Sequence, residues 1–234
     1  MELKAEGDFE GYTLIIGFPG IGLVGIIAAR HIIEELQMKY VGYVAGGEFP
    51  AVATVRDGQT LPPIRLYTLP EKKLACLVSD ITIPDDVCNP VADAIVKFAK
   101  ERKVARILSL AGIIVPRAQE SAVYGVGATE KDLHEIQRYG IVPVSRGMTT
   151  GISAAILLKA AEAGVPAALI LGQLHAKEDF RAAADVVKKL DEILGIGVDV
   201  GTLLERAEKI EKELAEISSK LRTRVERHMP TMYG

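Results

Sequence analysis

Residues 20–25 are the first stretch of the chain whose residue types and spacing could carry chemistry. They read Gly-Ile-Gly-Leu-Val-Gly, the spacing G-x-G-x-x-G, between an apolar run and a helical pattern. In a dinucleotide-binding protein, such glycines let the backbone approach a pyrophosphate at a helix N-terminus. Here Pro19 occupies the turn before the first glycine, and the first acidic residue after the second predicted strand is Glu48, beyond a Gly-Gly pair. The stretch therefore favours a tight turn and a close helix–sheet contact over a dinucleotide site.

The loop that begins at Asp80 is the second such region. Asp80, Asp85 and Asp86 flank Ile-Thr-Ile-Pro after a predicted strand, and ligand sites in α/β sheets favour the carboxyl ends of strands. A candidate cleft for a nucleoside- or nucleotide-like ligand, the enzymatic alternative, is outlined by Gly20, Gly22, Asp80 and Arg146. A polar loop with helix-capping acids explains the same region more simply, so we expect no catalytic residues. The sequence has no H-E-x-x-H motif and no Cys/His cluster, so we expect neither a metal site nor a cofactor.

The third region is the end of the sequence, Met232-Tyr233-Gly234. It offers a hydrophobic side chain, a tyrosine ring and a carboxylate on an exposed peptide. Pro230 cannot continue a helix and biases Met229 toward extended geometry. A terminal carboxylate can pair with a lysine in a charge-assisted contact. The alternative is a frayed terminus with no role.

A long charged helix is predicted before this peptide. Thr202 and Glu205 have the spacing of a capping box, and apolar residues then recur at steps of 4, 3, 4, 3 and 4, a period of 3.5. The members of this apolar seam are Leu203, Ala207, Ile210, Leu214, Ile217 and Leu221. A single seam needs a partner. It either packs back on the body of the protein or pairs with another copy of the chain, and we favour the second.

Composition excludes several classes of function. The 234 residues carry a net charge of −3 with no run of like charges, so a nucleic-acid partner is not expected. Two cysteines are too few for a disulfide framework and fit a reducing compartment. Residues 11–29 are uncharged and long enough to span a bilayer, but their glycines and proline fit a buried strand–turn–helix better. We therefore expect a cytoplasmic protein without a membrane partner.

The hydrophobic pattern alternates strands and helices. Short runs rich in Val, Ile and Leu on both faces predict buried strands, and apolar residues at helical spacing predict helices between them. The predicted strands include Tyr12–Phe18, Tyr40–Ala45, Ala51–Val55, Ile64–Leu69, Lys73–Ser79, Val104–Val115, Ala122–Val126 and Ala167–Leu171. The predicted helices include Leu23–Met38, a helix to Arg102 with Asn89 as N-cap and Pro90 at its first position, a short helix capped by Thr129 that stops at Gly140, Thr149–Ala163 and Glu178–Leu194.

This alternation indicates an α/β fold with a mixed, largely parallel sheet between helices. We expect an α/β core domain over residues 1–200, a long heptad-patterned helix over 201–227 and an extended C-terminal tail over 228–234.

Two blocks of sequence carry a resemblance to a known family. Residues 17–25, Gly-Phe-Pro-Gly-Ile-Gly-Leu-Val-Gly, and residues 146–153, Arg-Gly-Met-Thr-Thr-Gly-Ile-Ser, resemble the signature blocks of the PAC2 family, the proteasome assembly chaperone 2 group and its archaeal homologues. The likeness covers most of residues 12–227. It implies a fold similar to that of nucleoside phosphorylases, and it implies assembly into oligomers.

The terminal tripeptide also resembles a known motif, the hydrophobic-Tyr-any (HbYX) ending of proteasome activators and assembly chaperones. The resemblance implies that Met232, Tyr233 and Gly234 bind 20S proteasome α-subunits. The expected protein is a homo-oligomeric proteasome assembly chaperone homologue, a tetramer or a similar assembly. Activation of the assembled particle is the second role that the resemblance allows.

Overall fold

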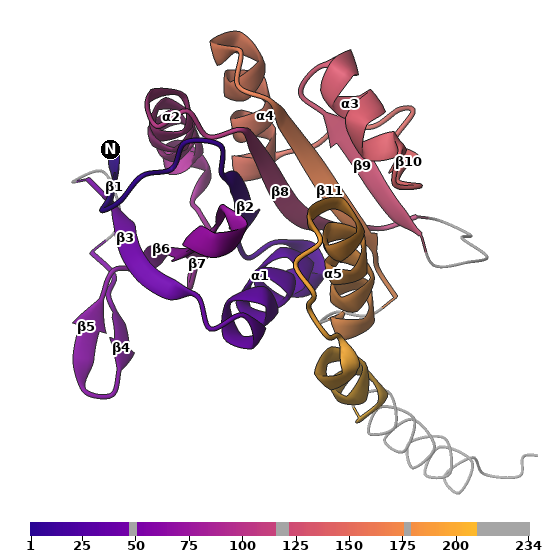
Figure 1. The fold of residues 1–234 in the computed structure, drawn as a ribbon, viewed down its shortest axis with the longest axis horizontal. Coiled ribbons are helices and arrows are strands. Elements are labelled where there is room, and N and C mark those ends of the chain that lie inside the picture. Colours follow the sequence, from indigo (N-terminus) through magenta and orange to yellow (C-terminus); the bar gives the residue numbers. More distant parts are fainter. Residues whose placement is uncertain (47–50, 116–121, 176–178, 210–234) are drawn as a thin grey trace, which may run out of the picture.

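The computed structural model describes residues 1–46, 51–115, 122–175 and 179–209. Their centre is a nine-stranded sheet with strand order β1-β3-β6-β7-β2-β8-β11-β9-β10, and β4 and β5 form a separate hairpin (Figure 1). The strands are β1 (Glu2–Ala5), β2 (Thr13–Gly17), β3 (Lys39–Ala45), β4 (Thr54–Arg56), β5 (Gln59–Leu61), β6 (Ile64–Leu69), β7 (Leu74–Ser79), β8 (Arg106–Ile113), β9 (Val123–Gly127), β10 (Val142–Pro143) and β11 (Ala167–Gln173). The helices are η1 (Ile21–Leu23), α1 (Val24–Glu35), η2 (Pro70–Lys72), α2 (Asp85–Glu101), α3 (Glu130–Gln137), α4 (Gly151–Ala163) and α5 (Phe180–Leu194), and residues 201–209 are also helical.

The middle of the sheet is parallel. β7, β2, β8 and β11 pair in parallel in that order, and every residue of β2, β7 and β11 is buried. Strands covered on both faces need apolar side chains on both, which explains their continuous runs of Val, Ile and Leu. The outer pairs β1–β3, β3–β6, β6–β7 and β11–β9 are antiparallel. The predicted mixed α/β fold is confirmed.

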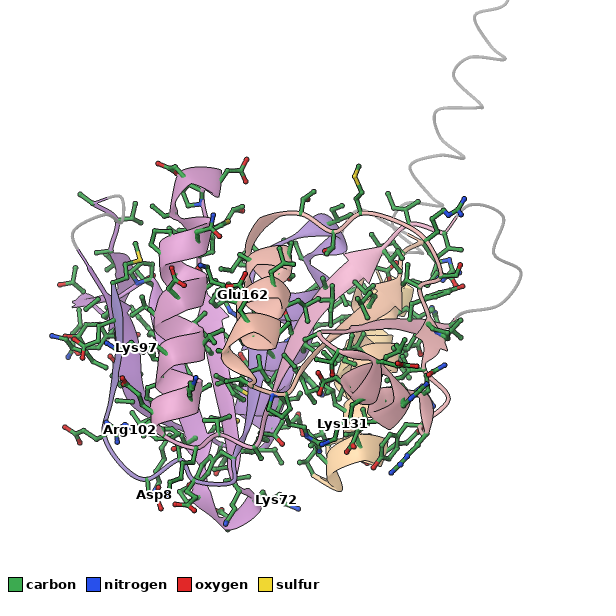
Figure 2. All side chains as sticks on the ribbon, turned by 90° about the horizontal axis from the view of Figure 1, so that it is seen from above. Asp8, Lys72, Lys97, Arg102, Lys131 and Glu162 are labelled. Atoms are coloured by element: carbon green, nitrogen blue, oxygen red, sulfur yellow. The ribbon has the colours of Figure 1, made fainter. Side chains whose placement is uncertain are left out.

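Two layers of helices cover the sheet. Buried residues of α2 and α4 pack with one face of the sheet, and those of α1 and α5 pack with the opposite face. In Figure 2, α2 and α4 lie in front of the sheet, with Lys97 on α2 and Glu162 on α4 labelled. The amphipathic periodicity of these helices gives each one a buried stripe, so the core consists of two apolar layers separated by the sheet.

The two ends of the sheet differ from its middle. At one end, β1 carries the exposed side chains of Glu2 and Lys4. At the other end, β10 has only two residues, one of which is Pro143. The β4–β5 hairpin projects from the body beside β3, as Figure 1 shows. The predicted strand Ala51–Val55 overlaps the first strand of this hairpin, β4, which begins only at Thr54.

The start of α2 differs from the prediction. The helix begins at Asp85, so Asn89 is not its N-cap and Pro90 lies inside the helix. Asp85 and Asp86 occupy the first turn, where carboxylates complement the helix dipole. The burial of Val87 and Cys88 adds two apolar contacts to this turn. These gains offset the backbone hydrogen bond that Pro90 cannot donate.

The start of the last described helix also differs. Residues 201–209 are helical, so Thr202 lies within the helix and the predicted Thr202–Glu205 capping box is wrong. The amides of Leu203 and Leu204 both donate to the Val200 carbonyl at 3.1 Å. A preceding acid satisfies another free amide, since Gly201 N donates to Asp199 Oδ2 at 3.2 Å. By contrast, the predicted cap of α3 is confirmed, because Thr129 forms a capping box with Asp132.

Candidate functional site

The glycine turn lies where the chain passes from β2 to α1. A Cβ atom at Gly25 would lie 2.2 Å from the Leu110 carbonyl oxygen, and one at Gly17 would lie 2.5 Å from the Gly25 carbonyl oxygen. Gly22 has a φ of +70°, and a Cβ there would meet Leu174. These three glycines are therefore explained by a tight turn and by the close approach of α1 to β2 and β8. Gly20 has open space around it.

Asp80 does not join the glycine turn but forms a network of charged and polar groups with other elements. Its Oδ1 forms an ion pair with Arg30 of α1. Its Oδ2 lies 2.7 Å from Arg65 Nη2 of β6 and accepts a hydrogen bond of 2.5 Å from Thr54 Oγ1 of β4. Asp80 thus connects the sheet, α1 and the hairpin.

The charges in this network stabilise one another. Burial alone would raise the pKa of Asp80, but hydrogen bonds from Thr54 and Arg65 and the charge of Arg65 lower it below the ordinary value. Burial alone would lower the pKa of Arg65, but its hydrogen bonds with Tyr67 and Asp80 raise it. The other two nitrogens of Arg65 also have partners, since Nε donates to Tyr67 Oη at 3.2 Å and Nη1 to the Pro62 carbonyl at 2.7 Å. Asp80 and Arg65 are therefore both charged at neutral pH.

A pocket of about 420 Å³ opens beside this network. It lies between α1, the β6 and β7 strands and the hairpin strand β4. Its lining consists of Arg30, Ile33, Glu34, Thr54, Val55, Arg56, Arg65, Tyr67, Val78 and Asp80.

Of the four residues of the predicted cleft, only Asp80 lines this pocket, whereas Gly20, Gly22 and Arg146 do not. Sequence reasoning missed Arg30 and Arg65. Arg65 could have been noticed as the one charged residue of the β6 run, but nothing near Arg30 points to Asp80, which is 50 positions away.

The base of the C-terminal helix is attached to the body of the protein. Leu203 is 1% exposed and belongs to the apolar cluster formed by α1 and α5, and Ala207 is buried as well. His31 Nε2 lies 2.5 Å from the Asp199 carbonyl oxygen, and Lys72 Nζ donates to the Gly195 carbonyl at 3.1 Å. The first two positions of the predicted seam thus pack within the chain itself.

The other positions of the seam, Ile210, Leu214, Ile217 and Leu221, lie outside the described residues. Met232, Tyr233 and Gly234, which form the predicted binding tripeptide, also lie outside them.

Cys76 is fully buried within β7, and burial raises the pKa of its thiol, so this cysteine is not positioned for chemistry. Within the part of the chain that the structure describes, no three His, Cys, Asp or Glu side chains gather as a metal site would require. Across the same residues, no helix combines the length and apolar character needed to cross a bilayer.

Comparison with known proteins identifies the family. A model described as the PAC2 family matches residues 14–218. The chain belongs to the PAC2 family. Among its relatives is an uncharacterised protein of Methanocaldococcus jannaschii, which is 30% identical over 231 residues that cover 97% of this chain and 95% of the relative.

Two solved structures of Pyrococcus furiosus proteins extend the comparison. PbaA, described as an archaeal homolog of proteasome-assembly chaperone, has a TM-score of 0.85 and 32% identity, with 100% of each chain covered. PbaB, described as an archaeal proteasome activator, has a TM-score of 0.79 and 24% identity, with 92% of this chain and 98% of PbaB covered. At 24% identity, the likeness to PbaB is a likeness of fold. The likeness to PbaA is one of both sequence and fold, to a protein that is described as a homolog of proteasome-assembly chaperone.

Proposed function

We propose that the chain is a homo-oligomeric proteasome assembly chaperone homologue that binds 20S proteasome α-subunits through its C-terminal tripeptide. The observation that carries the proposal is the coincidence of two independent features. One is membership of the PAC2 family over residues 14–218 together with the likeness to PbaA along the full chain. The other is the Met232-Tyr233-Gly234 ending, which the family match does not include.

The tripeptide supplies three kinds of contact to a pocket between α-subunits. Met232 and Tyr233 offer apolar surface, and the phenol of Tyr233 adds a hydrogen-bonding group. The carboxylate of Gly234 pairs with a lysine of the pocket through a charge-assisted hydrogen bond. A fully extended segment of residues 228–234 spans at most about 25 Å, so the tripeptide enters a pocket without movement of the α/β domain.

Binding through several tails is central to the proposed mechanism. One tripeptide buries little surface and binds weakly. Tails that belong to one oligomer raise the effective concentration of each other, and the gain in avidity reaches about 10²–10⁴-fold where the geometry allows simultaneous binding. The heptad pattern of the predicted seam supports such an oligomer, because its later positions Leu214 and Ile217 are apolar residues available to pair with another copy.

The test compares the full chain with a variant that lacks Met232–Gly234. We expect the full chain to capture α-subunits in a pull-down and the truncated chain to lose this binding, with an unchanged circular dichroism spectrum and unchanged mass on a sizing column. Thr231→Ala, just upstream of the tripeptide, is the matched control and retains binding. Equal capture of α-subunits by the full and the truncated chains would contradict the proposal.

A second experiment distinguishes a role in proteasome assembly from a role in proteasome activation. The full chain is mixed with free α-subunits and, separately, with complete 20S particles, and peptide hydrolysis by the particles is followed. Faster ring formation from free α-subunits indicates an assembly factor, whereas faster hydrolysis by complete particles indicates an activator. In either case, the effect depends on Tyr233, so Tyr233→Ala abolishes it.

A further inference from the structure

We propose that the pocket beside Asp80 binds a small organic anion, a carboxylate or a phosphate monoester with an apolar portion. The residues that line this pocket do not include the C-terminal tripeptide, and the test of its ligand does not use proteasome binding. The inference rests on the charge of the pocket lining, on the donors that remain open in it, and on its size.

The pocket lining has an excess of positive charge. Three of its residues are arginines, Arg30, Arg56 and Arg65, whereas two are acids, Glu34 and Asp80. Because both oxygens of the Asp80 carboxylate accept contacts from Arg30, Arg65 and Thr54, this carboxylate is already neutralised. With Glu34 counted, three guanidinium groups against two carboxylates leave a surplus of one positive charge in the lining, which favours an anionic ligand.

The arginines divide into one that holds the site and two that face a ligand. Arg65 has a side chain only 7% exposed, and each of its three guanidinium nitrogens has a partner, in Asp80, Tyr67 or Pro62. It therefore fixes Asp80 rather than a ligand.

Arg30 is 51% exposed, and Asp80 is its one partner among the described residues. A guanidinium has five N–H donors in a rigid fork, so most donors of Arg30 remain open beside the pocket. Arg56, an exposed residue of β4, lines the pocket too. The ion pair with Asp80 holds Arg30 in place, so this residue loses little side-chain entropy when an oxyanion binds.

The rest of the lining sets the class of ligand. Ile33, Val55 and Val78 contribute apolar side chains to the lining, and Tyr67 lines the pocket as well. A volume of about 420 Å³ is near the lower end of the range for small-molecule sites. It fits a single-ring carboxylic acid or phosphate ester and is small for a dinucleotide.

Binding of the anion should also stabilise the β4–β5 hairpin. The β4–β5 pair is a separate two-stranded sheet, and an isolated hairpin of this kind is marginally stable. Thr54 anchors it to Asp80. A ligand held between Arg56 on the hairpin and Arg30 on α1 would connect the two elements. Slower amide hydrogen exchange at residues 54–61 is therefore expected in the ligand-bound protein.

The experiment titrates the full chain with phenyl phosphate, benzoate, inorganic phosphate and neutral benzyl alcohol in a calorimeter. We expect saturable binding of phenyl phosphate or benzoate, weaker binding of inorganic phosphate, and none of benzyl alcohol. Tighter binding of phenyl phosphate than of benzoate identifies the ligand class as phosphate esters, and the reverse order identifies it as carboxylates. Arg30→Gln and Arg56→Gln should each weaken binding about tenfold or more, since each removes charge-assisted hydrogen bonds.

Two controls keep the test specific. Lys97→Gln removes one positive charge from α2, on the opposite face of the sheet (Figure 2), and should leave binding unchanged. Arg30→Lys keeps the charge but loses the fork and should bind more weakly than the parent. The proposal is overturned if no anion binds saturably, if benzyl alcohol binds as well as the anions, or if Arg30→Gln and Arg56→Gln bind as the parent does.

Discussion

Substitution of Gly25 by alanine tests whether the glycine motif serves packing. The added Cβ would lie 2.2 Å from the Leu110 carbonyl oxygen and 3.2 Å from that of Phe18. Leu110 cannot move away easily, because its strand pairs with Gly17 on one side and Ile170 on the other. The clash therefore displaces α1 from the sheet. Such overpacking costs about 1–3 kcal/mol, and the rigid backbone on the far side of the contact places this case at about 2–3 kcal/mol.

Gly20→Ala is the matched control, because it lies in the same motif but has open space around it. Its backbone is extended, with a φ of −151°, which alanine adopts without strain. We expect a change in stability within about 0.5 kcal/mol for this variant.

The assay is thermal and guanidinium unfolding followed by circular dichroism. For a chain of this length, the loss at Gly25 corresponds to a decrease in Tm of about 4–12 °C, with Gly20→Ala close to the parent. The reasoning is refuted if Gly25→Ala is as stable as the parent, or if Gly20→Ala loses as much stability as Gly25→Ala.

Two further predictions concern Asp80 and the C-terminal seam. Asp80→Asn should lower the free energy of unfolding by about 3 kcal/mol at pH 7, because it leaves the buried Arg65 without its counter-charge. The folded pKa of Asp80 lies below its ordinary value of 3.8, so this stabilisation is complete above that pH and is lost as the pH falls through the folded pKa; a parent–variant difference that stays constant in denaturant titrations down to pH 2 would contradict it. Leu214→Asp combined with Ile217→Asp should lower the oligomeric mass in light scattering, while Ser218→Asp, which adds a charge outside the seam, should not; an unchanged mass for the double variant would refute self-association through the seam.

The central strands could be predicted because their environment leaves a strong local pattern. A strand covered on both faces must be largely apolar, and residues 14–17 and 167–172 have this property. The cap of α3 was also predictable, because Thr129 and Asp132 interact within one turn. Both signals lie within a few consecutive residues.

Where the prediction failed, distant packing outweighed a local rule. An Asn-Pro pair is typical of a helix start, but the burial of Val87 and Cys88 against the sheet extends α2 past Pro90 toward its N-terminus. In the helix over residues 201–209, the prediction made the Thr202 side chain the acceptor for free amides of the first turn. The Val200 carbonyl and the Asp199 carboxylate fill this role instead.

The charged site was predictable only in part. The position of Asp80 at the carboxyl end of a buried strand indicated a polar site. Its partners come from α1, β4 and β6, and no sequence pattern specifies which of the chain's arginines reaches it. The pairing results from the strand order, which places β6 beside β7. The C-terminal tripeptide, by contrast, is a purely local signal and remains a prediction.

The two borders of the nine-stranded sheet limit how copies of this chain can meet. Unpaired main-chain groups along an edge strand invite a strand from another molecule, and charged side chains or proline on short edges discourage this. Glu2 and Lys4 on β1 and Pro143 on the two-residue β10 provide this protection. Lateral joining of sheets into fibres is therefore disfavoured at both borders, and copies that associate do so through side chains on helices, loops or the hairpin.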